Sequence, residues 1–316
     1  MTGRSHRAHL AIVTGWNLAI AQGRSYSGPG VGSKVHGEDG SLTNPTATER
    51  LVFEAAGTWA ADALRLAADP STGAEATRKG EPFGDPFDVV TPADGIIERY
   101  LRDEVRKRFP DHGFLGEEEG GANGAHGWLW IVDPIDGTLN YSTGLAGAAA
   151  SIACMEDGEL VVGAIADLSG GRVYRSMRAA GTILVSDGTG ESVSEPSSSP
   201  AGAARIFLEF GWEDLDPVMV GTIEQLATKR LRVIRMVGGA AYALLNVALR
   251  GGCMLGIGLR IWDVAAGIVL AREAGREVRF WDAGSLVHLI VGSADDVREL
   301  APVVERFGSS RVAPVG

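Results

Sequence analysis

The feature of this 316-residue chain that most constrains its fold is a short apolar segment that ends in two aspartates. Residues Trp128 to Val132 are apolar throughout, which is typical of a strand buried on both faces of its sheet. The string Asp133-Pro134-Ile135-Asp136-Gly137-Thr138 follows without a break. Pro134 fixes the turn between the aspartates, and Gly137 lets the backbone approach another group closely. The sequence therefore predicts a buried strand with an acidic end.

Helix and strand patterns flank this segment on both sides. Apolar residues at helical spacing predict helices over Thr46–Ala68 and Pro92–Phe109. Further strands of the first half are expected at Gly113–Gly116, Ala148–Met155 and Leu160–Ala166. The second half alternates strand and helix, in the order Arg205–Phe210, Val218–Thr228, Leu231–Met236, Ala240–Arg250, Met254–Ile257 and Val264–Ala274. Such alternation predicts a layered α/β architecture.

Composition shifts divide the chain into three parts. Residues 1–46 hold a Gly-Ser-Pro cluster and little helical periodicity, so we expect a mobile extension that does not carry the chemistry. A Ser-, Gly- and Pro-rich stretch at 188–203 predicts the boundary between an N-terminal half, 47–190, and a C-terminal half, 191–316.

Charge and cysteine content narrow the class of partner and the compartment. A net charge of −11 argues against a nucleic-acid or anionic-membrane partner, because both need basic patches. No run of 18 apolar residues predicts a transmembrane helix. The two cysteines, Cys154 and Cys253, lie in apolar surroundings without metal-binding spacing, as in a protein of the reducing cytoplasm. A segment near the N-terminus, Leu10 to Ala21, mimics a secretory signal, but polar residues and a glycine interrupt it.

The acidic end of the buried strand suits a divalent cation. Asp133 and Asp136, held three residues apart, would repel and raise each other's pKa unless a cation lay between them. Hard cations such as Mg²⁺ take carboxylate and carbonyl oxygens. A helix that begins after Gly137 would offer free N–H groups to a phosphate, and Thr138 a hydroxyl that orients water. The alternative is an Asp-rich turn that only caps the next helix.

Two further acidic segments indicate function only when they are considered together with the aspartate string. Glu117-Glu118-Glu119 alone would be a solvated loop, and Asp263 alone a helix N-cap. Together with the aspartate string, they resemble the three signature motifs of the inositol monophosphatase family. The matching segments are Gly116–Glu118, Trp130–Tyr141 and Trp262–Gly267, with an upstream element formed by Lys79 and Asp88–Asp94. The resemblance covers roughly residues 48 to 305.

The resemblance implies a fold, an activity and a site. The fold would be a layered α-β-α-β-α sandwich of the inositol monophosphatase and fructose-1,6-bisphosphatase type, in a protein that is commonly a homodimer. Two or three Mg²⁺ ions would bind Glu117, Asp133, the carbonyl of Ile135, Asp136 and Asp263. Glu117 and Thr138 would position and activate the attacking water, with Asp94 at the same cluster. The amides of Gly137 and Thr138 would hold the phosphate.

The substrate side departs from the family pattern. The inositol-specific members carry a Glu seven residues before the last metal Asp, where this chain has Gly256. Arg260, close by, is a candidate contact for a second anionic group, and Lys79 for the phosphate. Gly239 stands where the family often has Ser. The pair Asn140-Tyr141 favours a cyclitol or sugar phosphate as substrate, unless it serves only in packing.

The resulting hypothesis is a cytoplasmic, Mg²⁺-dependent phosphomonoesterase acting on a small phosphorylated polyol. A second interpretation keeps the chemistry and changes the substrate to histidinol phosphate, fructose 1,6-bisphosphate or an intermediate of a specialised pathway. A third is a non-catalytic relative that binds metal or phosphate. A calcium-binding structural protein would need an alternating-acid loop, which the sequence lacks.

Overall fold

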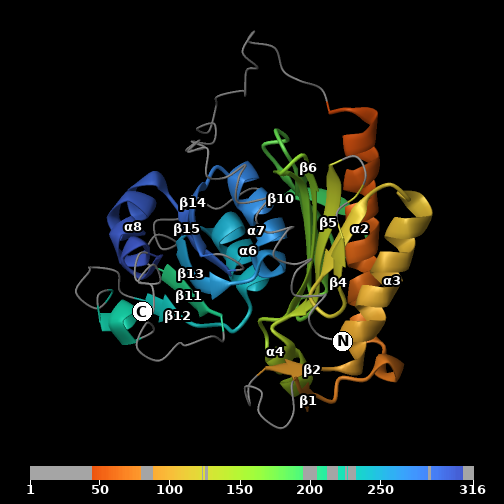
Figure 1. Cartoon of the computed structure of the whole chain (residues 1–316), viewed down its shortest axis with the longest axis horizontal. Helices are drawn as coiled ribbons and strands as arrows, with labels where there is room; N and C mark the ends of the chain where they lie inside the picture. The colour runs from red at the N-terminus through yellow and green to blue at the C-terminus, as the bar shows by residue number, and fades with distance from the viewer. Residues whose placement is uncertain are drawn as a thin grey trace, which may run out of the picture.

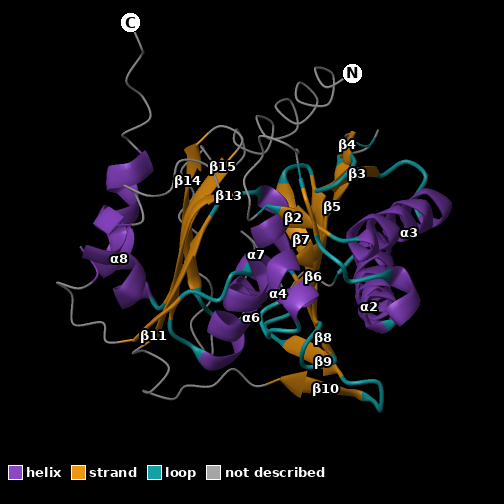
Figure 2. Ribbon diagram, turned by 90° about the horizontal axis from the view of Figure 1, so that it is seen from below, coloured by secondary structure: helices purple, strands orange, loops and turns teal. Residues whose placement is uncertain are grey.

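The structure, a computed structural model, is a five-layer sandwich of helices and sheets (Figures 1 and 2). It describes residues 45–79, 88–122, 124, 127–194, 205–211, 220–224, 226, 233–283 and 286–308. The predicted extension therefore lies outside the described residues, apart from 45 and 46. Of the helix expected at Val218–Thr228, residues 220–224 and 226 are described and are helical, and the others lie outside the described residues. The layered α-β-α-β-α architecture confirms the fold expected from the sequence.

Helices form the first, third and fifth layers. Helices α2 (Ala47–Ala68) and α3 (Pro92–Arg108) cover the outer face of the first sheet. Helices α6 (Ala240–Arg250) and α7 (Ile261–Glu273) lie between the two sheets, and α8 (Ala294–Gly308) covers the second sheet. The predicted bounds of α6 are confirmed, and no helix in the described ranges is long and apolar enough to span a bilayer.

Within the described residues, one sheet has eight strands and the other five. The first runs β10-β9-β8-β7-β6-β5-β3-β4, built from β3 (Gly113–Gly116), β4 (Gly120–Ala122), β5 (Trp128–Asp136), β6 (Ala149–Glu156), β7 (Glu159–Asp167), β8 (Arg172–Met177), β9 (Ile183–Ser186) and β10 (Glu191–Ser194). The second runs β12-β11-β13-β15-β14, built from β11 (Arg205–Phe210), β12 (Val233–Arg235), β13 (Cys253–Leu259), β14 (Glu277–Ala283) and β15 (Leu286–Gly292). Short elements complete the chain: η1 (Pro70–Thr72), β1 (Thr77–Arg78), β2 (Val89–Val90) and α4 (Thr138–Thr143).

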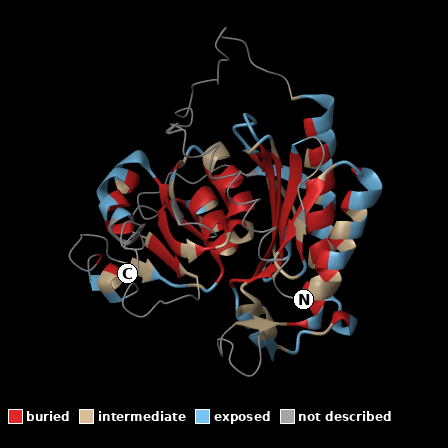
Figure 3. Cartoon of the chain, viewed as in Figure 1, coloured by how far each residue is buried: buried red, intermediate tan, exposed pale blue. Residues whose placement is uncertain are grey.

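Strand β5 lies inside the first sheet, between β3 and β6, and all nine of its residues are buried (Figure 3). Its Trp130 packs edge-to-face on Trp59 of α2, with ring centroids 4.8 Å apart. The strand is longer than the predicted Trp128–Val132, because pairing with β6 resumes at Asp136 after an irregularity. The acidic string thus belongs to the strand and is held by the sheet.

The middle layer explains why α6 and α7 are apolar on most sides. One hydrophobic cluster joins both helices to the inner faces of both sheets, so neither helix has a broad solvent face (Figure 3). The helices also approach closely, since a Cβ on Gly267 would lie 2.5 Å from Cβ of Leu244. This packing fixes the N-termini of α6 and α7 relative to the end of β5.

Candidate metal centre and active site

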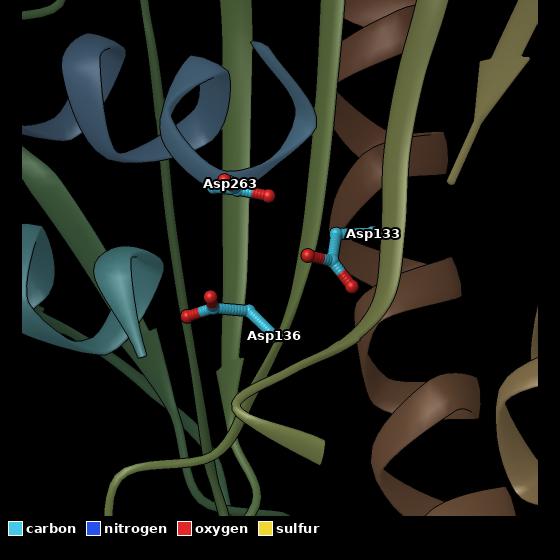
Figure 4. Close-up of side chains that lie close together, drawn as sticks. All are labelled: Asp133, Asp136 and Asp263. Carbon is cyan, nitrogen blue, oxygen red and sulfur yellow. The ribbon is translucent and has the colours of Figure 1, made fainter. Parts of the chain in front are cut away.

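Three aspartates from distant parts of the chain converge beside the middle layer (Figure 4). Asp133 and Asp136 come from the end of β5, and Asp263 comes from the first turn of α7. One carboxylate oxygen from each lies within 4.8 Å of the other two. The carboxylates predicted on separate motifs therefore form one cluster.

The irregular end of β5 orients its two aspartates by backbone hydrogen bonds. The amide of Ile135 donates to Oδ1 of Asp133 at 3.0 Å, which closes a tight turn around Pro134. Asp136 accepts from two amides of α6: Ala240 N at 3.0 Å on Oδ1 and Ala241 N at 2.8 Å on Oδ2. The N-terminus of α6 thus binds a carboxylate from the eight-stranded sheet, an interaction that the helix dipole favours.

Asp263 lies three residues inside α7. Its Oδ2 accepts the amide of Arg260 at 2.7 Å, which is the backbone half of a capping box. The helix begins at Ile261, earlier than the predicted Val264, and this bond is the physical reason. The Asp263 carboxylate lies opposite those of Asp133 and Asp136 (Figure 4).

The electrostatics of the cluster favour a divalent cation. Burial, followed by repulsion from neighbouring carboxylates, raises the pKa of Asp133 and that of Asp136 well above the usual range. Burial and the charge of Glu117 raise the pKa of Asp263 to about 7. Several carboxylates gathered in an apolar interior are costly unless a cation or protons neutralise them. This donor set, all oxygen, fits a hard cation such as Mg²⁺.

Glu117 lies in the turn between β3 and β4, at the edge of this cluster. Nζ of Lys79, at the end of β1, lies 2.7 Å from Oε1 of Glu117 and 2.7 Å from Oε1 of Glu118. Burial alone would lower the pKa of Lys79, but the charges of both glutamates raise it above its ordinary value. Burial and the charge of Glu117 raise the pKa of Glu118 to about 7. Lys79 therefore brings a fixed positive charge next to the acidic cluster.

Asp94 and Thr138 form a second hydrogen-bonded unit. The Thr138 hydroxyl lies 2.9 Å from the carbonyl of Ile135 and 3.3 Å from Oδ1 of Asp94. Oδ2 of Asp94 accepts from the amide of Thr91 at 2.8 Å and from its hydroxyl at 2.6 Å. Burial raises the pKa of Asp94 to about 6 in spite of these bonds. A carboxylate that accepts from Thr138 leaves the lone pairs of that hydroxyl free to orient a water.

Backbone packing around the cluster leaves no room for side chains at two glycines. Gly137 has φ +81°, and a Cβ there would lie 2.8 Å from the carbonyl oxygen of Gly147 and 2.9 Å from that of Gly238. A Cβ on Gly239 would approach the same Gly147 oxygen more closely still, and would lie 3.1 Å from Oδ2 of Asp136. A side chain at position 239 would therefore require the surrounding backbone to shift.

The structure shows what surrounds the positions at which the substrate side departs from the family pattern. Gly256 is on β13, where a Cβ would come within 3.0 Å of δ-methyl groups of Leu259 and Leu289. Arg260 contributes its backbone amide to Asp263. The side chain of Asn140 donates to the carbonyl of Val237 at 2.6 Å. Similarly, the hydroxyl of Tyr141 donates to the carbonyl of Ala67 at 2.8 Å, so the Asn-Tyr pair ties structural elements together.

Two buried glutamates near the site were missed by the sequence analysis. Glu98, on α3, accepts the amides of Glu118 at 2.7 Å and Glu119 at 2.9 Å, and so holds the turn that carries Glu117. Glu209, on β11, accepts the amides of Val237 and Gly238. The sequence signal that could have identified both glutamates is an acidic residue on an otherwise apolar face of a strand or helix.

Comparison with known proteins supplies the family. The model of the inositol monophosphatase family matches residues 46–304. The chain belongs to the inositol monophosphatase family. Several relatives are named as inositol monophosphatases, so the protein is a phosphoric monoester hydrolase of this family, whose members depend on metal ions.

Individual relatives agree in sequence and in fold. The inositol-1-monophosphatase of Mycobacterium bovis is 30% identical over 238 residues, which cover 72% of this chain and 82% of the relative. The fructose-1,6-bisphosphatase/inositol-1-monophosphatase of Thermotoga maritima is 33% identical over 194 residues, 60% of this chain and 70% of the relative. The structure of Mycobacterium tuberculosis SuhB superimposes with a TM-score of 0.64 at 27% identity, covering 82% of this chain and 97% of that one.

Proposed function

We propose that this member of the inositol monophosphatase family is a Mg²⁺-dependent phosphomonoesterase that hydrolyses a small cyclitol or sugar phosphate. The observation that carries the proposal is the cluster of Asp133, Asp136 and Asp263, whose carboxylate oxygens lie within 4.8 Å of one another. The raised pKa values of these carboxyls support a site that requires a cation for its charge balance.

Two or three Mg²⁺ ions would be held by this cluster together with Glu117 and the carbonyl of Ile135. Bound Mg²⁺ offsets the charge of the phosphoryl group and increases the acidity of the attacking water. The Thr138 hydroxyl lies within hydrogen-bond distance of both the Ile135 carbonyl and Asp94, and it has one proton to donate. With the Ile135 carbonyl bound to a cation, that proton would be donated to Asp94. A protein with a net charge of −11 needs such cations to attract an anionic substrate.

The chain's own groups orient the water and the phosphate. Thr138 would accept a hydrogen bond from the attacking water while it donates to Asp94, and Glu117 would take up the proton that the water loses. The amides of Gly137 and Thr138, at the start of α4, would bind phosphate oxygens. Lys79, paired with Glu117 and Glu118, would add positive charge on the same side.

The substrate class rests on the family rather than on Asn140 and Tyr141, whose side chains bond to other parts of the fold. A small polyol phosphate fits the names of the relatives, which include an inositol-1-monophosphatase and a fructose-1,6-bisphosphatase/inositol-1-monophosphatase. Gly256 favours a substrate that does not need a carboxylate at that position. Histidinol phosphate, fructose 1,6-bisphosphate and specialised phosphate intermediates thus remain the alternatives.

The proposal is tested by phosphate release in Mg²⁺ from a panel of substrates. The panel holds myo-inositol 1-phosphate, fructose 1,6-bisphosphate, histidinol phosphate, 3′-phosphoadenosine 5′-phosphate, and several sugar and aminocyclitol phosphates. We expect one cyclitol or sugar phosphate to be hydrolysed well above the others. Preference for histidinol phosphate or the nucleotide would contradict the substrate class, and release from none would contradict the function.

Assembly and location complete the proposal. We expect a homodimer in the cytoplasm, and the buried free thiols of Cys154 and Cys253 suit a reducing compartment. Light scattering coupled to gel filtration tests the dimer, and fractionation of cells that express the full chain tests the location.

A further inference from the structure

Glu209 is a buried carboxylate that the proposed chemistry does not use. It lies near the end of β11 and is only 5% exposed. Alternation along the strand places it on the same face as Phe207, toward the middle layer, while Leu208 points to the other side. A charged side chain at such a position is rare unless it is fully hydrogen-bonded.

Glu209 accepts hydrogen bonds from successive amides of one loop, those of residues 237 to 239. Oε1 accepts from Val237 N at 2.9 Å, and Oε2 accepts from Gly238 N at 3.1 Å. Asn140, which follows the aspartate string, binds the carbonyl of Val237 from the opposite side at 2.6 Å. The loop is therefore held on both sides, and Gly238 adopts the left-handed conformation, with φ +72°, that lets it turn.

This loop leads directly into α6. Gly239 is the N-cap of the helix, and the next two amides, Ala240 N and Ala241 N, bind the two oxygens of Asp136. The amides that bind Glu209 therefore come directly before the amides that bind Asp136. A displacement of the loop would therefore also displace the two amides that donate to Asp136, because a segment this short cannot absorb the movement.

We propose that Glu209 is a positioning residue of the metal site, which fixes the N-terminus of α6 and thereby the Asp136 carboxylate in its ligating orientation. This inference rests on the proposed Mg²⁺-dependent function. It assigns Glu209 no contact with substrate or metal. Groups that orient ligands through intermediate bonds commonly change metal affinity about 10- to 100-fold when they are removed.

A carboxylate suits this role better than an amide of the same shape. Two parallel N–H donors require two acceptor oxygens, whereas glutamine offers one oxygen and one NH₂ group. Glu209→Gln would leave one loop amide facing a donor, with little change in volume. Glu209→Asp keeps the charge but shortens the side chain by one methylene, so it cannot reach both amides in the same geometry.

The structure offers a matched control in Glu273. This residue, at the end of α7, also accepts two loop amides, from Ala179 at 3.1 Å and Gly181 at 2.7 Å. It lies ten residues along α7 from Asp263, which corresponds to roughly 15 Å. Glu273→Gln removes the same kind of contact far from the aspartate cluster.

The first measurement is amide hydrogen exchange on the metal-free full-length protein. We expect Glu209→Gln and Glu209→Asp to speed exchange at residues 237–241, and Glu273→Gln to leave that segment unchanged. Unchanged exchange at 237–241 in both Glu209 variants would overturn the inference, whether or not the protein is a phosphatase.

The second measurement is calorimetric titration with Mg²⁺ alone, followed by the Mg²⁺ dependence of phosphate release. We expect the Kd for Mg²⁺ to rise about tenfold or more in Glu209→Gln, with kcat largely restored at saturating Mg²⁺. The Kd should stay within about twofold in Glu273→Gln. Equal Mg²⁺ affinity in wild type and Glu209→Gln would overturn the inference, whereas absence of Mg²⁺ binding by the wild type would overturn the proposed function itself.

Discussion

The substitution Asp136→Asn separates the role of this side chain in folding from its role in metal binding. In the metal-free protein, Asp136 repels Asp133 and Asp263, with carboxylate oxygens within 4.8 Å. Two ionised groups at that separation repel by about 3 kcal/mol at an effective dielectric constant near 20. The pKa of Asp263 is raised to about 7, so this carboxyl is partly protonated near neutral pH, which reduces the relief to a fraction of that figure.

The opposing cost of the substitution comes from α6. Both oxygens of Asp136 accept helix amides, and asparagine satisfies only one of them, which costs about 1.5–3 kcal/mol. The relief of repulsion and the cost of the lost hydrogen bond are of similar size. We therefore expect the free energy of unfolding of the metal-free variant to lie within about 2 kcal/mol of that of the metal-free wild type. Asparagine also has nearly the volume of aspartate, so the surrounding packing should survive.

Mg²⁺ should then distinguish the two proteins. A ligand present at 100 times its Kd stabilises the folded state by about 2.7 kcal/mol, which raises Tm by about 4 °C in a chain of this size. Thermal unfolding in EDTA and in excess Mg²⁺ measures both states. We expect this shift in the wild type and little or none in Asp136→Asn. Equal Mg²⁺-induced shifts in the two proteins would refute the assignment of Asp136 as a ligand.

Three further predictions follow from the geometry. Because the pKa of Asp263 is about 7 in the metal-free state, Mg²⁺ binding should release protons, and the Mg²⁺ affinity should increase as pH rises from 6 to 8. Calorimetry in buffers of different ionisation enthalpy checks this, and a pH-independent Kd would contradict it. Gly256→Ala should cost about 1–3 kcal/mol in urea unfolding by overpacking Leu259 and Leu289, while Gly190→Ala, with open space around it, should cost under about 0.5 kcal/mol. Gly239→Ala should raise the half-saturating Mg²⁺ concentration about tenfold by moving α6 away from Asp136, and an unchanged Mg²⁺ titration would argue against that coupling.

The predictable elements are those whose local sequence pattern alone indicates their burial or their ends. The unbroken apolar run Trp128–Val132 predicted a strand buried on both faces, and all of β5 is buried. The bounds of α6 and β11 agree with the prediction because a glycine flanks the end of each. The aspartate string predicted a cation site before any other residue could be placed near it.

What escaped prediction depends on contacts between distant segments. Glu209 binds backbone amides 28 and 29 positions further along the chain, and Glu98 binds amides 20 and 21 positions further along. The sequence around either glutamate does not indicate these partners. The extension of β5 through Asp136 required the pairing with β6. Likewise, the surroundings of Gly256 come from β15, a strand that the sequence analysis did not identify.

The most direct test of the account is phosphate release from the preferred substrate by EDTA-treated protein, as free Mg²⁺ is added back. We predict no release above background without metal, recovery as Mg²⁺ rises, and no recovery in Asp263→Asn, which keeps its helix N-terminus but loses a ligand charge. Full activity in EDTA, or full recovery by Asp263→Asn at the wild-type Mg²⁺ concentration, would contradict the claim that the three aspartates form the metal centre of a phosphatase.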